Sequence, residues 1–133
     1  MSWVYQISVH RLIATDGEIF DAGLYSGAFG DYQNNPDCCN LVDRGPIPPG
    51  NWKATGLVDD PKTGDYTIVL APADVETLQS VKALGRDPFS FRMHGERIPP
   101  AAPGYASEGC IIAPRTVREA FWNSEDHSLQ VTA

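Results

Sequence analysis

The decisive stretch of this 133-residue chain reads His94-Gly95-Glu96-Arg97, then a Pro/Gly-rich connection, then Ser107-Glu108-Gly109-Cys110-Ile111. A thiol acts as a nucleophile in its thiolate form, and a nearby imidazole is the usual base that generates it. Gly109 permits a sharp turn and a close approach of the backbone to a substrate. The amides of Gly109 and Cys110 are therefore candidate donors to a developing oxyanion. The stretch predicts Cys110 as a nucleophile, with His94 as its base.

The residues before His94 predict a strand over 89–94. Alternation assigns the side chains to two faces, an apolar one with Phe89, Phe91 and Met93, and a polar one with Ser90, Arg92 and His94. We expect His94 at the end of this strand, available for chemistry rather than for packing. Ser107 is expected to hydrogen-bond locally and to shape the turn before Cys110. The alternative at this point is a structural turn with no chemistry.

The remaining pattern predicts one domain over residues 1–133 that is mainly β, with a small mixed or closed sheet and two short helices. A long loop is expected over 26–44, and a turn at Asp16-Gly17. Further strands are predicted over 3–13, 18–25, 51–58, 66–71 and 128–132, and helices over 73–84 and 114–123.

The composition excludes several classes of partner. The net charge is −7, so the composition does not predict the positively charged surface that binds nucleic acid or an anionic membrane. No apolar run approaches the length of a membrane span. The first residues, Met1 to Gln6, lack the basic and apolar regions of a signal peptide. We therefore expect synthesis in the cytoplasm and, if the chain is exported, a route without a cleaved signal.

The three cysteines leave alternatives open. Cys38 and Cys39 are adjacent, and Cys110 stands alone. A vicinal disulfide between the first two requires local backbone strain. A metal site that adds Cys110 and His94 has poor ligand spacing. We favour the third interpretation, in which Cys38 and Cys39 carry no chemistry, and we predict neither a metal nor a cofactor.

Three separated segments carry a family resemblance that covers roughly residues 24–122. They read Tyr25-Ser26-Gly27, Gly45-Pro46-Ile47-Pro48-Pro49-Gly50 and Ala106-Ser107-Glu108-Gly109-Cys110-Ile111-Ile112. Together they resemble the YkuD-type L,D-transpeptidases, and within these the short type VI secretion L,D-transpeptidase effectors. The resemblance implies a YkuD-like β-sandwich or barrel that acts on peptidoglycan stem peptides.

The resemblance also implies a mechanism. Cys110 attacks the carbonyl of meso-diaminopimelate at its bond to D-alanine, and His94 takes the thiol proton and returns it to the leaving amine. The acyl-enzyme then reacts with water, as an L,D-carboxypeptidase, or with an amine, as a transpeptidase. In the family the second imidazole nitrogen is oriented by a carbonyl or a polar neighbour, for which Gly95 and Ser107 are the candidates. Tyr25 and Ser26 are expected to line the cleft.

Two positions depart from the pattern of many family members. Glu108 stands where they carry histidine, and a carboxylate that faced the thiol would raise its pKa. We expect Glu108 to point outward or to contact substrate amines. Ile112 stands where they carry an arginine, so another cation must bind a substrate carboxylate. Arg92 is the first candidate, followed by Arg97 and Arg115.

Partners and location follow from the same resemblance. It implies delivery by a type VI secretion component, action in the periplasm of a target bacterium, and a cognate immunity protein. The rival functions are a cysteine peptidase or amidase of other specificity, and a non-catalytic wall-binding or interaction module. Rapid alkylation of Cys110 that depends on His94 would favour an enzyme over a binding module.

Overall fold

The computed structural model describes residues 1–97 and 104–133, and within them it places nine strands in one mixed sheet with two short α-helices. The prediction of a mainly β domain with two short helices is confirmed. In chain order the strands are β1 Trp3–Gln6, β2 Arg11–Ile13, β3 Ile19–Phe20, β4 Tyr25–Ser26, β5 Gly50–Asp60, β6 Gly64–Pro72, β7 Arg92–His94, β8 Ile111–Ile112 and β9 Ser128–Thr132. In the sheet they lie in the order β3-β2-β1-β9-β5-β6-β7-β8-β4. The helices are α1 Val75–Ala83 and α2 Arg115–Asn123.

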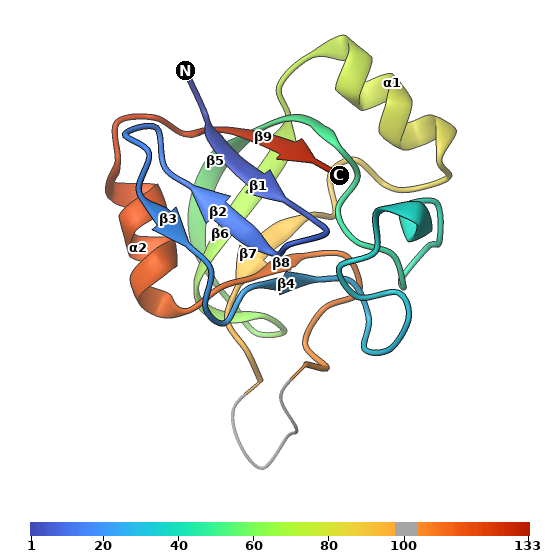
Figure 1. The fold of residues 1–133 in the computed structure, drawn as a ribbon, viewed down its shortest axis with the longest axis horizontal. Coiled ribbons are helices and arrows are strands. Elements are labelled where there is room, and N and C mark those ends of the chain that lie inside the picture. The colour runs from blue at the N-terminus through green and yellow to red at the C-terminus, as the bar shows by residue number, and fades with distance from the viewer. Residues whose placement is uncertain (98–103) are drawn as a thin grey trace.

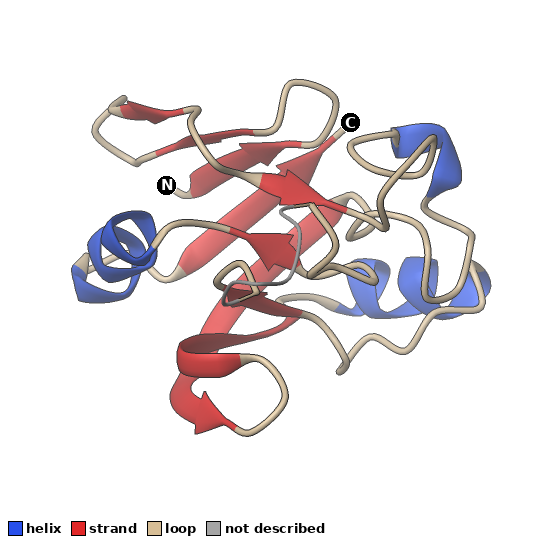
Figure 2. Cartoon of the chain, turned by 90° about the horizontal axis from the view of Figure 1, so that it is seen from below, coloured by secondary structure: helices blue, strands red, loops and turns tan. Residues whose placement is uncertain are grey.

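The sheet folds over itself and encloses the core. Strands β1 to β3 lie in front of β5 and β6 (Figure 1), and one apolar cluster joins Tyr5 of β1 with Leu70 of β6 and Met93 of β7. Both helices lie at the periphery of the strands (Figure 2). Two strand pairs, β1 with β9 and β7 with β8, are parallel. The second of these pairs carries the candidate reactive residues.

The N-terminal strands differ from the prediction. A continuous strand over 3–13 is wrong, because the chain turns after β1 and returns as β2 in an antiparallel hairpin. His10 adopts a φ of 41°, and its N–H donates to the Ile7 carbonyl at 3.1 Å. The predicted strand over 18–25 is divided into β3 and β4. The turn at Asp16-Gly17 is present, with the Gly17 N–H donating to Ala14 at 2.8 Å.

The later elements agree more closely with the sequence. The two strands predicted over 51–58 and 66–71 are the long hairpin of β5 and β6, which carries register shifts near Gly56 and Asp60. Helix α1 begins after Asp74, whose carboxylate accepts the Thr77 N–H at 2.8 Å. The strand predicted over 89–94 is shorter, since β7 begins at Arg92 and Phe89 is 60% exposed.

Candidate functional site

The parallel pairing of β7 with β8 brings His94 and Cys110 to one cleft. The register pairs Met93 with Ile111 and His94 with Ile112. Side chains alternate along a strand, so Met93 and Ile111 point into the core, and His94 takes the opposite face. Cys110 directly precedes Ile111 and also takes that face. Both side chains line a cleft of about 1040 Å³.

His94 is held in one tautomer by its neighbour. Its Nδ1 lies 2.9 Å from the Gly95 carbonyl oxygen. A carbonyl oxygen only accepts, so Nδ1 carries the proton and Nε2 presents its lone pair. The side chain is 5% exposed, and this burial lowers the pKa of His94 below its usual value, while the Gly95 hydrogen bond partly opposes the shift. The imidazole is therefore neutral and suited to accept a proton.

Cys110 is held as a thiol at rest. Burial raises the pKa of Cys110, and the Glu108 carboxylate raises it further, whereas the amide and charge of Arg92 lower it. Glu108 is exposed and lines the cleft. The resting pair is thus a neutral thiol and a neutral imidazole, and proton transfer has to accompany attack.

Two buried serines fix the loop that precedes Cys110. Ser107 is 2% exposed. Its hydroxyl donates to the Cys110 carbonyl at 2.6 Å and accepts the N–H groups of Gly27 and Gly109, each at 3.0 Å. Ser26 donates to the Gly109 carbonyl at 3.0 Å and accepts the Ile47 N–H at 2.9 Å.

These contacts decide one alternative and correct two expectations. Of the two candidates for orienting the imidazole, Gly95 makes the contact with His94. Ser26 of β4 is fully buried and is absent from the cleft wall. The Gly109 amide already donates to Ser107, so this amide is not free for an oxyanion. In the predicted oxyanion hole, the Cys110 amide is the remaining candidate.

Tyr25 also supports the cleft rather than lining it. Its hydroxyl donates to the Glu96 carboxylate, at 2.7 and 2.8 Å from the two oxygens, and accepts the Ala106 N–H at 3.1 Å. Glu96 also accepts the Gly104 N–H at 2.9 Å. Burial raises the pKa of Tyr25, so its hydroxyl stays protonated. These bonds tie together the two ends of the connection from β7 to β8.

A buried arginine joins the Pro-rich turn to the loop before Cys110. Arg86 is 6% exposed, and it donates to the carbonyls of Cys39, Gly45, Pro46 and Glu108 at 2.8 to 3.5 Å. Its guanidinium also lies over the Phe91 ring, 5.1 Å from the centroid. The Gly-Pro-Ile-Pro-Pro-Gly segment therefore supports the site through its backbone carbonyls. No sequence signal marks Arg86, which follows the glycine that ends a helix.

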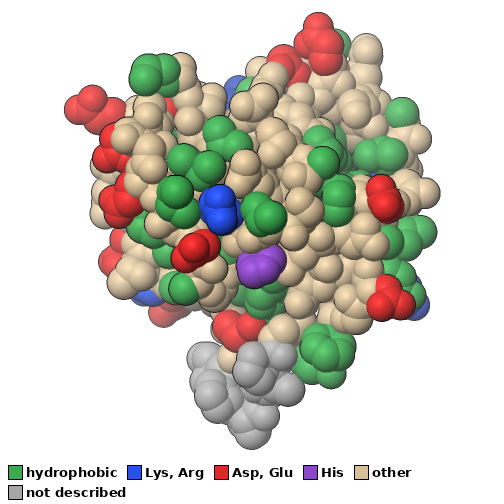
Figure 3. Space-filling model, in the orientation of Figure 1, with side chains coloured by type: hydrophobic (Ala, Val, Ile, Leu, Met, Phe, Trp, Pro, Cys, Tyr) green, Lys and Arg blue, Asp and Glu red, His purple; other side chains and the backbone are tan. Residues whose placement is uncertain are grey.

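The cleft lacks the negative excess of the whole chain. Among the described residues, six of the chain's ten lysine and arginine side chains line it, against six of its seventeen aspartate and glutamate side chains. Figure 3 shows one face of the molecule with scattered acidic groups and few basic ones. The cleft is therefore more suited to an anionic substrate than the net charge of −7 suggests.

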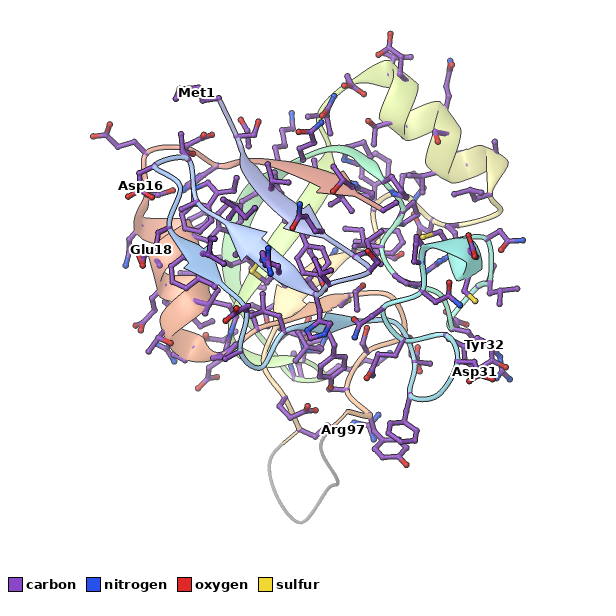
Figure 4. All side chains as sticks on the ribbon, viewed as in Figure 1. Met1, Asp16, Glu18, Asp31, Tyr32 and Arg97 are labelled. Atoms are coloured by element: carbon purple, nitrogen blue, oxygen red, sulfur yellow. The ribbon has the colours of Figure 1, made fainter. Side chains whose placement is uncertain are left out.

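The three predicted carboxylate-binding arginines all line this cleft. Arg92 is half-buried, and its Nη1 donates to the carbonyls of Phe89 and Phe91 at 3.1 and 3.0 Å. Arg115 is exposed, stacks on Tyr66 at 4.3 Å and pairs with Glu119 at 3.5 Å. Arg97 is exposed and lies far from the N-terminal Met1 (Figure 4).

A fourth arginine, Arg118 of α2, was not predicted. It is 7% exposed and lines the cleft beside Gly95. A signal was present in the sequence, because a position three residues before the core residue Phe121 lies on the same side of a helix. An arginine there has to be paired or functional.

The remaining predictions concern the cysteines, metals and membranes. Cys38, Cys39 and Cys110 are free thiols, so the vicinal disulfide is absent. In the described part of the chain, no group of three or more His, Cys, Asp or Glu side chains is arranged to hold a metal ion. No described helix has the length and apolar character needed to cross a membrane.

Comparisons with known proteins agree on the family and the fold. The family model described as the Tlde1 domain matches residues 21–132. Similar solved structures are Bd1075 of Bdellovibrio bacteriovorus (TM-score 0.60, 12% identity), the helical cell shape determining protein Pgp2 of Campylobacter jejuni (0.57, 14%) and the L,D-transpeptidase from Mycobacterium smegmatis (0.52, 15%). These matches cover 98%, 97% and 98% of this chain but 47%, 46% and 58% of the other chains, so it spans about half of their length. A comparison with curated proteins gives no match.

Proposed function

Because this chain belongs to the Tlde1 domain family of type VI L,D-transpeptidase effectors, we propose that it cleaves or exchanges the terminal D-alanine of peptidoglycan stem tetrapeptides. The observation that carries the proposal is the cleft shared by Cys110 and His94, in which the Gly95 carbonyl leaves Nε2 free to accept a proton. The fold, shared with an L,D-transpeptidase, supports the same chemistry.

The proposed reaction has two steps. His94 Nε2 takes the Cys110 thiol proton as Sγ attacks the meso-diaminopimelate carbonyl, and a thioester forms. The bond to D-alanine breaks, and His94 returns the proton to the leaving amine. Water then hydrolyses the thioester, or the amine of a free D-amino acid replaces D-alanine. The Cys110 amide is the proposed oxyanion donor.

The setting of this reaction is also a proposal. Action on peptidoglycan requires delivery to the periplasm of a target bacterium by a type VI secretion component. A producer that is open to the same attack needs a cognate immunity protein, and the cleft is the surface it has to block.

The test is a digest of purified tetrapeptide muropeptides, with and without a free D-amino acid, read by mass spectrometry. We expect wild type to release D-alanine, or to show the mass shift of the added amino acid, and Cys110→Ala to do neither. Cys38→Ala is the matched control, because it removes a free thiol outside the cleft and is expected to retain activity. Intact muropeptides with wild type, together with cleavage of another peptide bond that needs Cys110, would favour a cysteine peptidase or amidase. Binding without any cleavage would favour a non-catalytic module.

A further inference from the structure

Arg118 is fixed within the wall of the cleft by three backbone carbonyls. Its Nε donates to Ala113 at 3.0 Å, and its Nη1 donates to Asp65 and Tyr66 at 3.0 and 2.8 Å. With 7% of its surface exposed, the side chain has little freedom left to lose when it binds a ligand.

The third guanidinium nitrogen, Nη2, takes no part in these hydrogen bonds. It has no hydrogen-bond partner among the described residues. The described polar side-chain atoms that are both buried and unpaired are Tyr5 Oη and Arg11 Nε. Because Nη2 is unpaired but is not one of them, it is accessible to solvent, and Arg118 lines the cleft. A Cβ on Gly95 would lie 2.8 Å from Nη2. Gly95 therefore leaves this nitrogen open beside His94.

We infer that Arg118 Nη2 forms a subsite for the terminal carboxylate of the substrate's D-alanine, an inference that rests on the function proposed above. His94 has to reach the leaving amine of D-alanine in order to protonate it. The carboxylate of D-alanine is attached to the carbon next to that amine. A donor beside Gly95 is thus placed for the carboxylate when His94 is placed for the amine. A free D-amino acid that enters in the exchange reaction presents the same two groups.

The other cleft arginines fit this position less well. Arg92 uses Nη1 on two carbonyls of its own segment. Arg115 is exposed and already pairs with Glu119. An exposed side chain loses more conformational entropy on binding than a fixed one. Arg118 differs from both because, in the described part of the molecule, its unused Nη2 lies beside Gly95 and therefore next to His94.

The test compares two substrates, a peptide acid and its amide, in wild type and in arginine variants. Release of the terminal residue is measured by mass spectrometry for a tetrapeptide with a free terminal carboxylate and for its carboxamide. We expect wild type to prefer the acid in kcat/KM by about tenfold or more, as for a charge-assisted hydrogen bond. In Arg118→Gln, and in Arg118→Met if the glutamine variant does not fold, the cation is removed and this preference should shrink toward one. In Arg115→Gln, a matched change on the same helix, it should persist.

Each result has a separate meaning. Equal cleavage of acid and amide by wild type would overturn the subsite, because no carboxylate contact would then be used. A preference lost in Arg115→Gln but kept in the Arg118 variants would assign the contact to Arg115 and also overturn it. No cleavage of either peptide by wild type would overturn the proposed function itself, and with it the inference that rests on it. The ratio is compared within each variant, so a general loss of stability does not imitate the expected result.

Discussion

Each of two glycines beside the reactive pair lies against a buried guanidinium. Arg118 Nη2 lies next to Gly95, and Arg86 Nη2 lies where a Cβ on Gly109 would stand. Gly109 also has a φ of +141°, which L side chains rarely adopt. Glycine therefore leaves room for a cation at both positions, and at Gly109 it also permits the backbone conformation.

Gly109→Ala should lower the free energy of unfolding by about 2 kcal/mol or more, because a methyl group would displace Arg86 and would strain the backbone. Activity should fall as well, since the displaced arginine holds the Glu108 carbonyl. Denaturant unfolding and kcat/KM on the tetrapeptide measure the two effects. Gly30→Ala is the control, because Gly30 has a φ of +105° but a Cβ added there would meet nothing within 4 Å. Its cost should be about 1 kcal/mol, and equal costs for the two variants would contradict the crowding argument.

At this scale the sequence predicted Cys110, His94 and Gly109 as site residues from their types and order, and the structure places all three in the lining of one cleft. It did not predict that the Gly109 amide is engaged by Ser107. The direction of a hydroxyl within a turn depends on backbone angles that residue types do not specify. Arg86 was missed because its burial depends on carbonyls from distant segments, whereas for Arg118 the helical spacing to Phe121 was an available signal that the prediction did not use.

Between the elements, the Tyr25–Glu96 contact links β4 to the connection that carries the nucleophile. Tyr25→Phe would leave the Ala106 N–H and the Glu96 carboxylate each short of one partner. We expect the free energy of unfolding to fall by about 1 to 2 kcal/mol, and kcat/KM to fall because the loop before Cys110 is less ordered. Calorimetry and steady-state kinetics measure these changes.

Tyr32→Phe is the matched control for this prediction. The Tyr32 hydroxyl lies on the long loop after β4 (Figure 4) and accepts only a 3.5 Å contact from Arg44. Its removal should change neither quantity. A Tyr25→Phe variant with wild-type stability and activity would show that the link does not support the site.

Element length decided what the sequence could predict. The β5–β6 hairpin, helix α2 and strand β9 repeat their pattern over enough residues to be identified. The hairpin of β1 and β2 turns through Ile7 to His10, a segment without Gly, Pro, Asn or Asp, so no turn signal marks it. Strands β3, β4 and β8 have two residues each and exist because of their partners in the sheet.

Over the whole molecule, charge is distributed unevenly in a way that composition does not reveal. The net charge is −7, yet the cleft gathers six of ten basic side chains from the described residues. Six acidic side chains line the cleft as well, so its lining is balanced and the negative excess lies elsewhere on the surface. A carboxylate that approaches the cleft therefore meets less repulsion there than the net charge suggests. The fold also places His94 and Cys110 largely below the surface, and this burial moves their two pKa values in opposite directions, down for His94 and up for Cys110.

These opposite shifts predict the pH dependence of kcat/KM. His94 acts as a base only when it is deprotonated, and its pKa is lowered below 6.5, so activity should rise with pH and reach its plateau before the pH at which an ordinary histidine would complete its titration. The pKa of Cys110 is raised above 9.0, so the thiol that donates the proton persists and no loss is expected up to about pH 9. Kinetics on the tetrapeptide across this range measure both limbs. A midpoint of the acidic limb above 6.5 would contradict the lowered pKa of His94.

Alkylation of Cys110 by iodoacetamide, which needs thiolate, should be slower than that of a free thiol near pH 7 and should accelerate with pH. Rapid alkylation at neutral pH that is abolished in His94→Ala would instead indicate a preformed thiolate–imidazolium pair.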